Sequence, residues 1–257
     1  ADTKGDQSVA IGYAALSNQN FTTNGVDSNN TAVGFMAGIT VTSGQSNTII
    51  GSNAGFYLST GNNNTFLGMQ AGTGVSTNLL TGDRNIAIGA NAGFALQGGG
   101  AENVLMGSYA GDAIRTGTSN TIIGDNAGSG MTTAAGNVVM GHNALQDGEC
   151  GNDNVIIGNG AAFNATTITQ NTIIGAEAAG STSVHMTGDD NILIGRRAGF
   201  DVTSGADNTI IGNTSGGIDT GSSNVMVGKA LFTSSGGLDH AIILGNGITA
   251  GGNAFSF

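Results

Sequence analysis

The sequence predicts an all-β fold, a parallel β-solenoid of about fourteen short coils that forms one domain over residues 1–257. Three observations predict it: a strand core followed by glycine recurs throughout, 47 of the 257 residues are glycine, and proline is absent. Glycine makes up only roughly 7% of an average protein. Glycine-rich chains can be disordered, but disordered chains are poor in β-branched residues, whereas pairs such as Ile49-Ile50 and Ile122-Ile123 recur here. We therefore expect a folded chain that places its glycines in turns.

The repeat is a strand core that usually begins with asparagine and reaches glycine four residues later. Fourteen copies begin at Ser8, Asn30, Asn47, Asn64, Asn85, Asn103, Asn120, Asn137, Asn154, Asn171, Asn191, Asn208, Asn224 and Ala241. Most copies lie 17 residues apart, and longer connections occupy residues 13–29, 73–84 and 179–190. A fixed period of this kind is typical of solenoids, and missing prolines agree with it because proline would remove hydrogen bonds between coils.

Positions in the unit are counted from the asparagine. Position 2 is Thr, Val or Ile and position 4 is Ile, Val, Leu or Met, so these two, which share one face of a strand, are predicted to build the core. Position 3 points the opposite way and is also apolar, for example Phe66 and Ile173. Since a strand that is apolar on both faces is buried on both, position 3 is predicted to meet a second layer or another subunit.

Glycine at position 5 is predicted to occupy a turn that needs a positive φ or leaves no room for a Cβ. These turn glycines are Gly12, Gly34, Gly51, Gly68, Gly89, Gly107, Gly124, Gly141, Gly158, Gly175, Gly195, Gly212, Gly228 and Gly245. Alanine at position 8 predicts a second, tight edge where neighbouring backbones approach closely. Asparagine at position 1 is interpreted as a corner residue, because it tolerates the left-handed conformation and bonds its own backbone.

Composition argues against several functions. The net charge of −11 and the single adjacent basic pair, Arg196-Arg197, disfavour nucleic-acid binding. One cysteine, Cys150, excludes an internal disulfide, and no apolar run is long enough for a transmembrane helix. The three histidines lie in different coils, and nothing in the sequence indicates a metal, a cofactor or a catalytic residue.

The unit Asn/Ser-x-x-Ile-Gly-x-x-Ala, most literally Ser8-Val9-Ala10-Ile11-Gly12, resembles the head repeat of YadA-like trimeric autotransporter adhesins. Similar repeats occur in bacteriophage tail fibres and other bacterial surface fibres. The resemblance implies a left-handed β-roll, three parallel chains and attachment to a surface. The 17-residue unit is longer than the adhesin repeat and no coiled-coil stalk is present, which favours a phage or other fibre over an autotransporter head.

The resulting functional prediction is a structural or adhesive fibre module, not an enzyme, located outside the cell on a virion or a cell surface. Its expected partners are copies of itself in a homotrimer and a cell-surface glycan or protein receptor. The three longer connections are the preferred places for recognition, and Arg196, Arg197 and His185 are the candidate surface contacts.

Two other functions stay open at this stage. One is a purely architectural filament component; the other is a carbohydrate-active solenoid enzyme, which needs two carboxylates in a groove. Loose acidic groups occur around Asp147 and at Asp189-Asp190, but three tyrosines and no tryptophan predict no aromatic platform beside them.

Ligand-binding solenoids of two further kinds are disfavoured. The glycine-rich calcium-binding repeat is absent. An ice-binding threonine ladder is disfavoured because only six copies carry threonine at position 2, a position expected to face the core.

The last residues, 253–257, resemble the start of a further coil that ends in two phenylalanines. Because a solenoid needs a polar cap over its last strand, the sequence is expected to be a segment of a longer fibre.

Overall fold

The computed structural model describes residues 5–20, 26–181, 185–233, 237–251 and 255–256. Every regular element in this part of the chain is a short β strand, and the strands form about 13 parallel coils of about 17 residues. The predicted fold class is confirmed. A turn runs from one strand core to the next, so fourteen strand cores give about 13 complete turns. The chain divides into two compact units, Ala1–Ala135 and Gly136–Phe257. The single domain stays a prediction.

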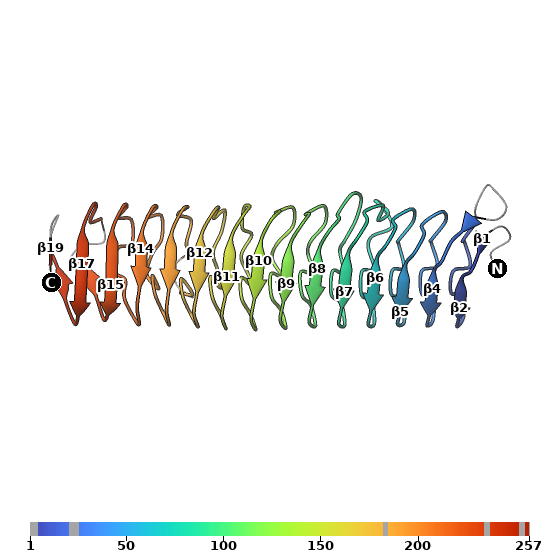
Figure 1. Cartoon of the computed structure of the whole chain (residues 1–257), viewed down its shortest axis with the longest axis horizontal. Helices are drawn as coiled ribbons and strands as arrows, with labels where there is room; N and C mark the ends of the chain where they lie inside the picture. Colours follow the sequence, from blue (N-terminus) through green and yellow to red (C-terminus); the bar gives the residue numbers. More distant parts are fainter. Residues whose placement is uncertain (1–4, 21–25, 182–184, 234–236, 252–254, 257) are drawn as a thin grey trace. The chain divides into compact units, whose positions relative to one another are not determined.

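In the first unit, successive strands pair in parallel and in sequence order, each with the strand of the next coil (Figure 1). These strands are β2 (Val9–Ile11), β4 (Thr31–Val33), β5 (Thr48–Ile50), β6 (Thr65–Leu67), β7 (Ile86–Ile88), β8 (Val104–Met106) and β9 (Thr121–Ile123). A separate small ladder joins β1 (Gly5–Asp6) to β3 (Val26–Asp27).

The second unit repeats this arrangement. Its main strands are β10 (Val138–Met140), β11 (Val155–Ile157), β12 (Thr172–Ile174), β13 (Ile192–Ile194), β14 (Thr209–Ile211), β15 (Val225–Lys229), β17 (Ile242–Asn246) and β19 (Phe255–Ser256). A second ladder joins β16 (Phe232–Thr233) to β18 (Thr249–Ala250). Strand β19 continues the pairing where the sequence predicts another coil, but the side chain of Phe255 and all of Phe257 lie outside the described residues.

The predicted facing of the strands was wrong. In β5, Ile49 at position 3 is fully buried, whereas Thr48 and Ile50 at positions 2 and 4 remain partly exposed. The same pattern holds from β4 to β17, so position 3 fills the coil and positions 2 and 4 face outward. The sequence could not settle the facing because apolar residues fill all three positions and the alternation that normally reveals it is missing. Threonine at position 2 was the available signal, since its hydroxyl favours the outer face.

The interior of each coil is narrow and is filled from three positions. Position 3 meets alanine at position 8 and an aliphatic residue at position 12, as in Ile49, Ala54 and Leu58, all fully buried. Large and small residues compensate between coils, because Phe66 lies beside Ala87 in the strand register. Such complementarity is needed in a core packed like an organic crystal.

The turn after each strand requires glycine, as predicted. All fourteen position-5 glycines have φ between 128° and 150°, a region that side chains rarely adopt. A Cβ on Gly51 would also collide with the carbonyl oxygen of Gly68 in the next coil. The alanine edge is confirmed too, since Gly55 N–H donates to the carbonyl of Ala71 one coil further along (2.9 Å).

The predicted role of the asparagines at position 1 is confirmed only in part: Asn154, Asn171 and Asn191 each donate to the backbone carbonyl two residues before them (3.1, 3.0 and 2.9 Å), but the asparagines are not the left-handed residues. The left-handed residue is the one before each of them, such as Ser46 or Asn63, while the asparagines are buried inside the coils. The Asn64 amide nitrogen donates to Asn47 Oδ1 (3.1 Å) and to the carbonyl of Gly82 (3.1 Å), and its backbone N–H also donates to Asn47 Oδ1 (2.9 Å). Equivalent bonds repeat within each unit, so the side chains form an asparagine ladder that joins successive coils and binds the backbone carbonyl three residues before the next strand core.

Two adjacent isoleucines test the facing of the strands. Ile122→Ala is expected to lower the free energy of unfolding by about 2–5 kcal/mol at any protein concentration, because it opens a cavity inside the coil. Ile123→Ala removes the same atoms from the outer face, so its cost should be smaller and should change with protein concentration if copies cover that face. Urea unfolding at several concentrations measures both, and a larger cost for Ile123→Ala in the dilute chain would contradict the facing.

The asparagine ladder predicts a pH-dependent defect. Asn103→Asp keeps the shape of the side chain but loses the donations to Asn85 Oδ1 (3.0 Å) and the Gly117 carbonyl (2.9 Å). The new carboxyl group would have a raised pKa in the folded chain and a pKa of about 3.9 in the unfolded chain. Its cost should therefore grow as the pH rises above about 4. Urea unfolding of this variant and the parent at pH 4 and pH 7 checks this; an equal cost at both pH values would show that the ladder amide does not act as a donor.

Candidate functional site

The first candidate surface is the outward strand face, defined as positions 2 and 4 of the main strands. From β2 to β17 these positions carry only Thr, Val, Ile, Leu and Met, with no charged side chain. Several are substantially exposed, including Leu67 (43%), Ile192 (40%) and Val227 (40%). Large exposed apolar patches mark interaction surfaces, so each unit presents a sheet face that another surface is expected to cover.

The threonines at position 2 also face outward, and the argument that placed them in the core was wrong. Thr31, Thr48 and Thr65 lie in three successive coils and are partly exposed. Their column is then interrupted by Ile86 and Val104. Position 2 therefore forms a mixed row of Thr, Val and Ile side chains and not a continuous row of threonines.

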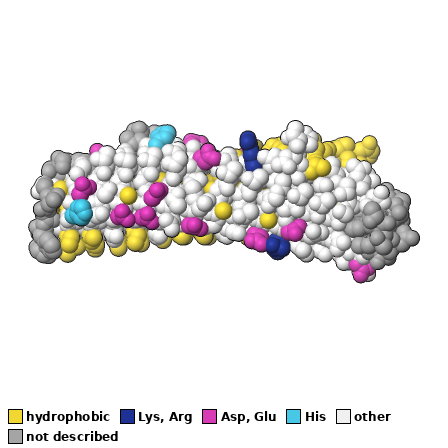
Figure 2. All heavy atoms as spheres, turned by 90° about the horizontal axis from the view of Figure 1, so that it is seen from above, with side chains coloured by type: hydrophobic (Ala, Val, Ile, Leu, Met, Phe, Trp, Pro, Cys, Tyr) yellow, Lys and Arg dark blue, Asp and Glu magenta, His cyan; other side chains and the backbone are white. Residues whose placement is uncertain are grey.

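Beside the outward strand face, position 6 differs between the units. In the first unit three residues at this position are large, apolar and exposed: Tyr13 and Phe35, whose rings stack at 5.4 Å, and Met69, which is 53% exposed. In the second unit no large apolar residue stands at this position, which includes Arg196 and Lys229. Figure 2 shows hydrophobic side chains gathered at the margins of the face in view, with acidic groups scattered between them.

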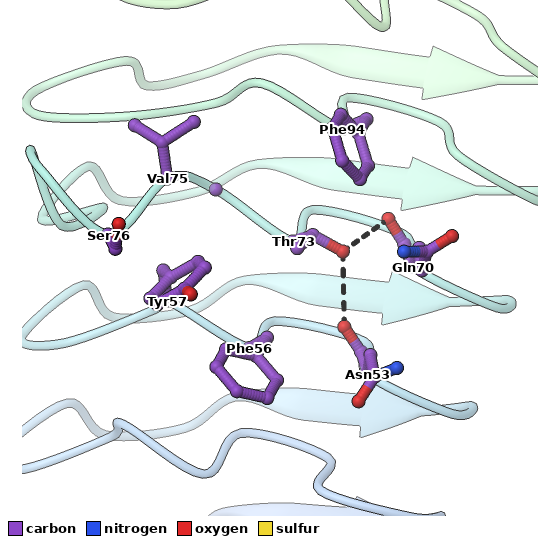
Figure 3. A pocket seen from close by; sticks show the side chains of 9 residues that line it. Asn53, Phe56, Tyr57, Gln70, Thr73, Val75, Ser76 and Phe94 are labelled. Atoms are coloured by element: carbon purple, nitrogen blue, oxygen red, sulfur yellow. Dashed lines mark hydrogen bonds between the residues drawn. The ribbon is translucent and has the colours of Figure 1, made fainter.

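The second candidate surface is a groove of about 420 Å³ in the first unit, which we call the aromatic groove (Figure 3). Its lining residues are Asn53, Phe56, Tyr57, Gln70, Thr73, Gly74, Val75, Ser76 and Phe94. Phe56 and Phe94 lie on either side of Thr73, whose hydroxyl donates to the backbone carbonyls of Gln70 (2.8 Å) and Asn53 (3.1 Å). The wall from Thr73 to Ser76 begins the predicted insertion 73–84, so one connection singled out for recognition borders this groove.

The aromatic groove extends into a neighbouring hollow of about 300 Å³ that shares Gln70 and Phe94 and adds Asn91, Tyr109 and Asp112. One wall comes from position 7 of four successive coils and the other from position 10. Phe56 also packs edge-on against Tyr57, with ring centroids 4.6 Å apart. The predicted lack of an aromatic platform concerned the acidic groups around Asp147 and at Asp189-Asp190, whereas this platform lies elsewhere, in the first unit. The missed signal was phenylalanine recurring at position 10, at Phe56, Phe94, Phe163 and Phe200.

Polar groups in the aromatic groove are left without partners. Among the described residues, the side-chain amides of Asn53, Gln70 and Asn91 make no hydrogen bond to the protein. Asp112 Oδ1 is buried and has no partner either, and burial raises the pKa of this carboxyl group. The groove thus offers flat apolar rings together with donors and acceptors that the fold itself does not use.

The second unit has a related but charged groove. Phe163, Phe200 and Glu177 line one hollow of about 310 Å³. Arg197 and Asp201 line the hollow next to it, which shares Phe200. The Arg197 guanidinium lies 4.1 Å from the centroid of the Phe200 ring, and its Nε lies 3.3 Å from Glu177 Oε2. One face of Phe200 is therefore already covered by a cation.

The predicted surface contacts do not form one patch of positive charge. Arg196 is exposed at position 6, whereas Arg197 pairs with Glu177 and stacks on Phe200. His185 is also exposed. Contact with a receptor through these three residues stays a prediction.

Several acidic residues have structural partners. Asp189 Oδ1 accepts a hydrogen bond from the backbone N–H of Thr169 (2.7 Å), and Asp83 Oδ1 does the same for Asn62 (2.7 Å). In the part of the chain that the structure describes, no group of three or more His, Cys, Asp or Glu residues is placed to hold a metal ion. That part also contains no helix long and apolar enough to cross a membrane.

Comparison with known proteins gives no assignment: no family model matches the chain, and no curated protein matches its sequence. The likeness to YadA-type head repeats therefore rests on the repeat motif alone, and the structure supports it as far as a β-roll repeat fold.

The single cysteine is expected to be unreactive in the folded chain. Cys150 is 5% exposed, and burial raises its pKa to about 12. Because the thiolate is the nucleophile, a disulfide reagent at pH 8 should modify it slowly in the native chain and rapidly in urea. Equal rates in both states would show that this coil opens in solution.

Proposed function

We propose that this chain is a structural fibre module that associates with copies of itself through the outward strand face and serves adhesion outside the cytoplasm, on a virion or a cell surface. The observation that carries the proposal is the absence of any charge from positions 2 and 4 of every main strand between β2 and β17. A face that met only water would have no reason to exclude Lys and Glu from so many positions.

A second copy of the chain is the occupant that fits this face best. Its β-branched side chains are spaced by the strand separation, about 4.8 Å, along each unit. An identical chain presents ridges of the same period, so the match can continue from coil to coil. Three chains per fibre is the number that the resemblance to trimeric adhesins implies, and a homotrimer is the proposed assembly.

The adhesive role rests on the separation of two kinds of surface. If copies cover the outward strand face, the grooves formed by positions 7 and 10 lie on other walls of the coil and stay open to a partner. The alternative hypothesis is a purely architectural filament. That hypothesis gives no role to the unpartnered polar groups of the aromatic groove.

The hypothesis of a carbohydrate-active enzyme has less support than the hypothesis of a binding module. The aromatic groove has one carboxylate, Asp112. The groove of the second unit has Glu177 and Asp201, and Glu177 is already paired with Arg197. A retaining or inverting glycosidase needs two carboxyl groups on opposite sides of the scissile bond. We therefore propose binding without hydrolysis.

The assembly is tested by light scattering on the intact chain. The parent is expected at three times its chain mass of 25.2 kDa. Ile50→Asp combined with Ile157→Asp places one charge on the outward strand face of each unit, where an assembly would bury it unpaired, and should yield monomers. The matched control, Ser43→Asp with Ser204→Asp, adds the same charge at exposed position-14 turns and should leave the mass unchanged.

Two results would contradict the proposal. A monomeric parent at micromolar concentration would remove the self-association, and full assembly of the Ile50→Asp, Ile157→Asp variant would place the interface on another face. Circular dichroism of both variants establishes that the coils remain folded.

A further inference from the structure

We propose that the aromatic groove of the first unit binds a neutral oligosaccharide chain, with Phe56 and Phe94 as stacking platforms and the amides of Asn53, Gln70 and Asn91 as hydrogen-bonding groups. This rests on the proposed adhesive function and names its ligand class and site. Tyr57, next to Phe56, and Tyr109, in the wall formed by position 7, add ring surface and hydroxyl groups.

The chemistry of the lining selects this ligand class. Each amide supplies both a donor and an acceptor, and each tyrosine hydroxyl does the same. A sugar ring matches this set because its hydroxyl groups donate and accept around the rim while its C–H face packs on an aromatic ring. Small-molecule sites commonly combine apolar walls with a few convergent polar groups in this way.

The geometry favours a chain over a single sugar. Phe56 and Phe94 come from coils two apart, about 10 Å along the stack, and the three amides come from three successive coils. A ligand that extends along the groove would meet a ring and an amide repeatedly, as a linear chain of sugar rings does.

Charge selects a neutral glycan over an acidic one. The groove contains no Lys or Arg among its lining residues, its one ionisable carboxyl group is Asp112, and the chain carries a net charge of −11. An acidic glycan would meet repulsion without a compensating cation.

Turn geometry does not account for these amides. Asn53, Gln70 and Asn91 have φ between 56° and 58°, and asparagine is favoured there when its side chain bonds the nearby backbone. In this structure the three side chains make no such bond, which leaves them available to a ligand.

The test uses the full chain and three neutral probes, cellotetraose, maltotetraose and chitotetraose, with an acidic tetragalacturonate for comparison. Binding is followed by saturation-transfer NMR and by tyrosine fluorescence. At least one neutral probe is expected to bind, and Phe94→Ala, which removes the ring shared by both halves of the groove, should weaken it about tenfold or more. Gln70→Ala should weaken it by a smaller factor, and the tetragalacturonate should not compete.

Phe200→Ala is the matched control, because Phe200 stands at the same position of the unit but lies under Arg197; it should change the affinity less than twofold. Melting curves show whether each variant is folded. The proposal is overturned if no neutral probe binds at 10 mM, if Phe94→Ala binds as well as the parent, or if Phe200→Ala loses binding equally. The Ile50→Asp, Ile157→Asp variant should still bind, so a failed assembly and a failed groove give different results.

Discussion

The whole structure depends on hydrogen bonding between neighbouring coils. Each strand is only about three residues long, too short to be stable by itself, and its backbone groups bond to the strands before and after it. Thr31 N–H, for example, donates to the Asn47 carbonyl (2.8 Å), and Gly51 N–H donates to the Val33 carbonyl (2.9 Å). The asparagine ladder adds a second set of bonds inside the coil. Because every coil must repeat this geometry, the sequence repeats as well.

The close spacing of the coils explains the composition. A separation of about 4.8 Å brings the turns so near that position 5 has no space for a Cβ, and position 8 is alanine in eleven coils, from Ala15 to Ala198. The interior is then so narrow that one residue of each strand fills it. Positions 2 and 4 are left outside, and the apolar surface that a globular protein would bury within one chain is exposed here.

The sequence predicted the fold because these restraints act within one repeat. The period, the parallel pairing and the glycine turns all follow from residues such as Gly51 and Asn64 that recur at fixed spacing. The facing of the strands did not follow, because Thr48, Ile49 and Ile50 offer no contrast in polarity large enough to show which side is buried. The role of the asparagines was predicted only in part, since a corner residue and a buried amide require the same amino acid. Only the contacts between coils distinguish the two.

The residues of the aromatic groove stand at positions of the unit whose residue type varies from coil to coil. A search for the repeating residues alone therefore missed the groove. Positions 1 and 5 are restrained by their neighbours in the stack and vary little, whereas positions 6, 7 and 10 carry many different residue types. At positions 7 and 10 the groove of the first unit carries aromatic rings and amides, and the groove of the second carries Arg197 and Glu177 beside two phenylalanines. One backbone therefore supports two grooves of different chemistry. Residues 53–112 form the groove only because the stack brings residues about 17 apart in sequence to adjacent coils, so the site is assembled by the period of the repeat itself.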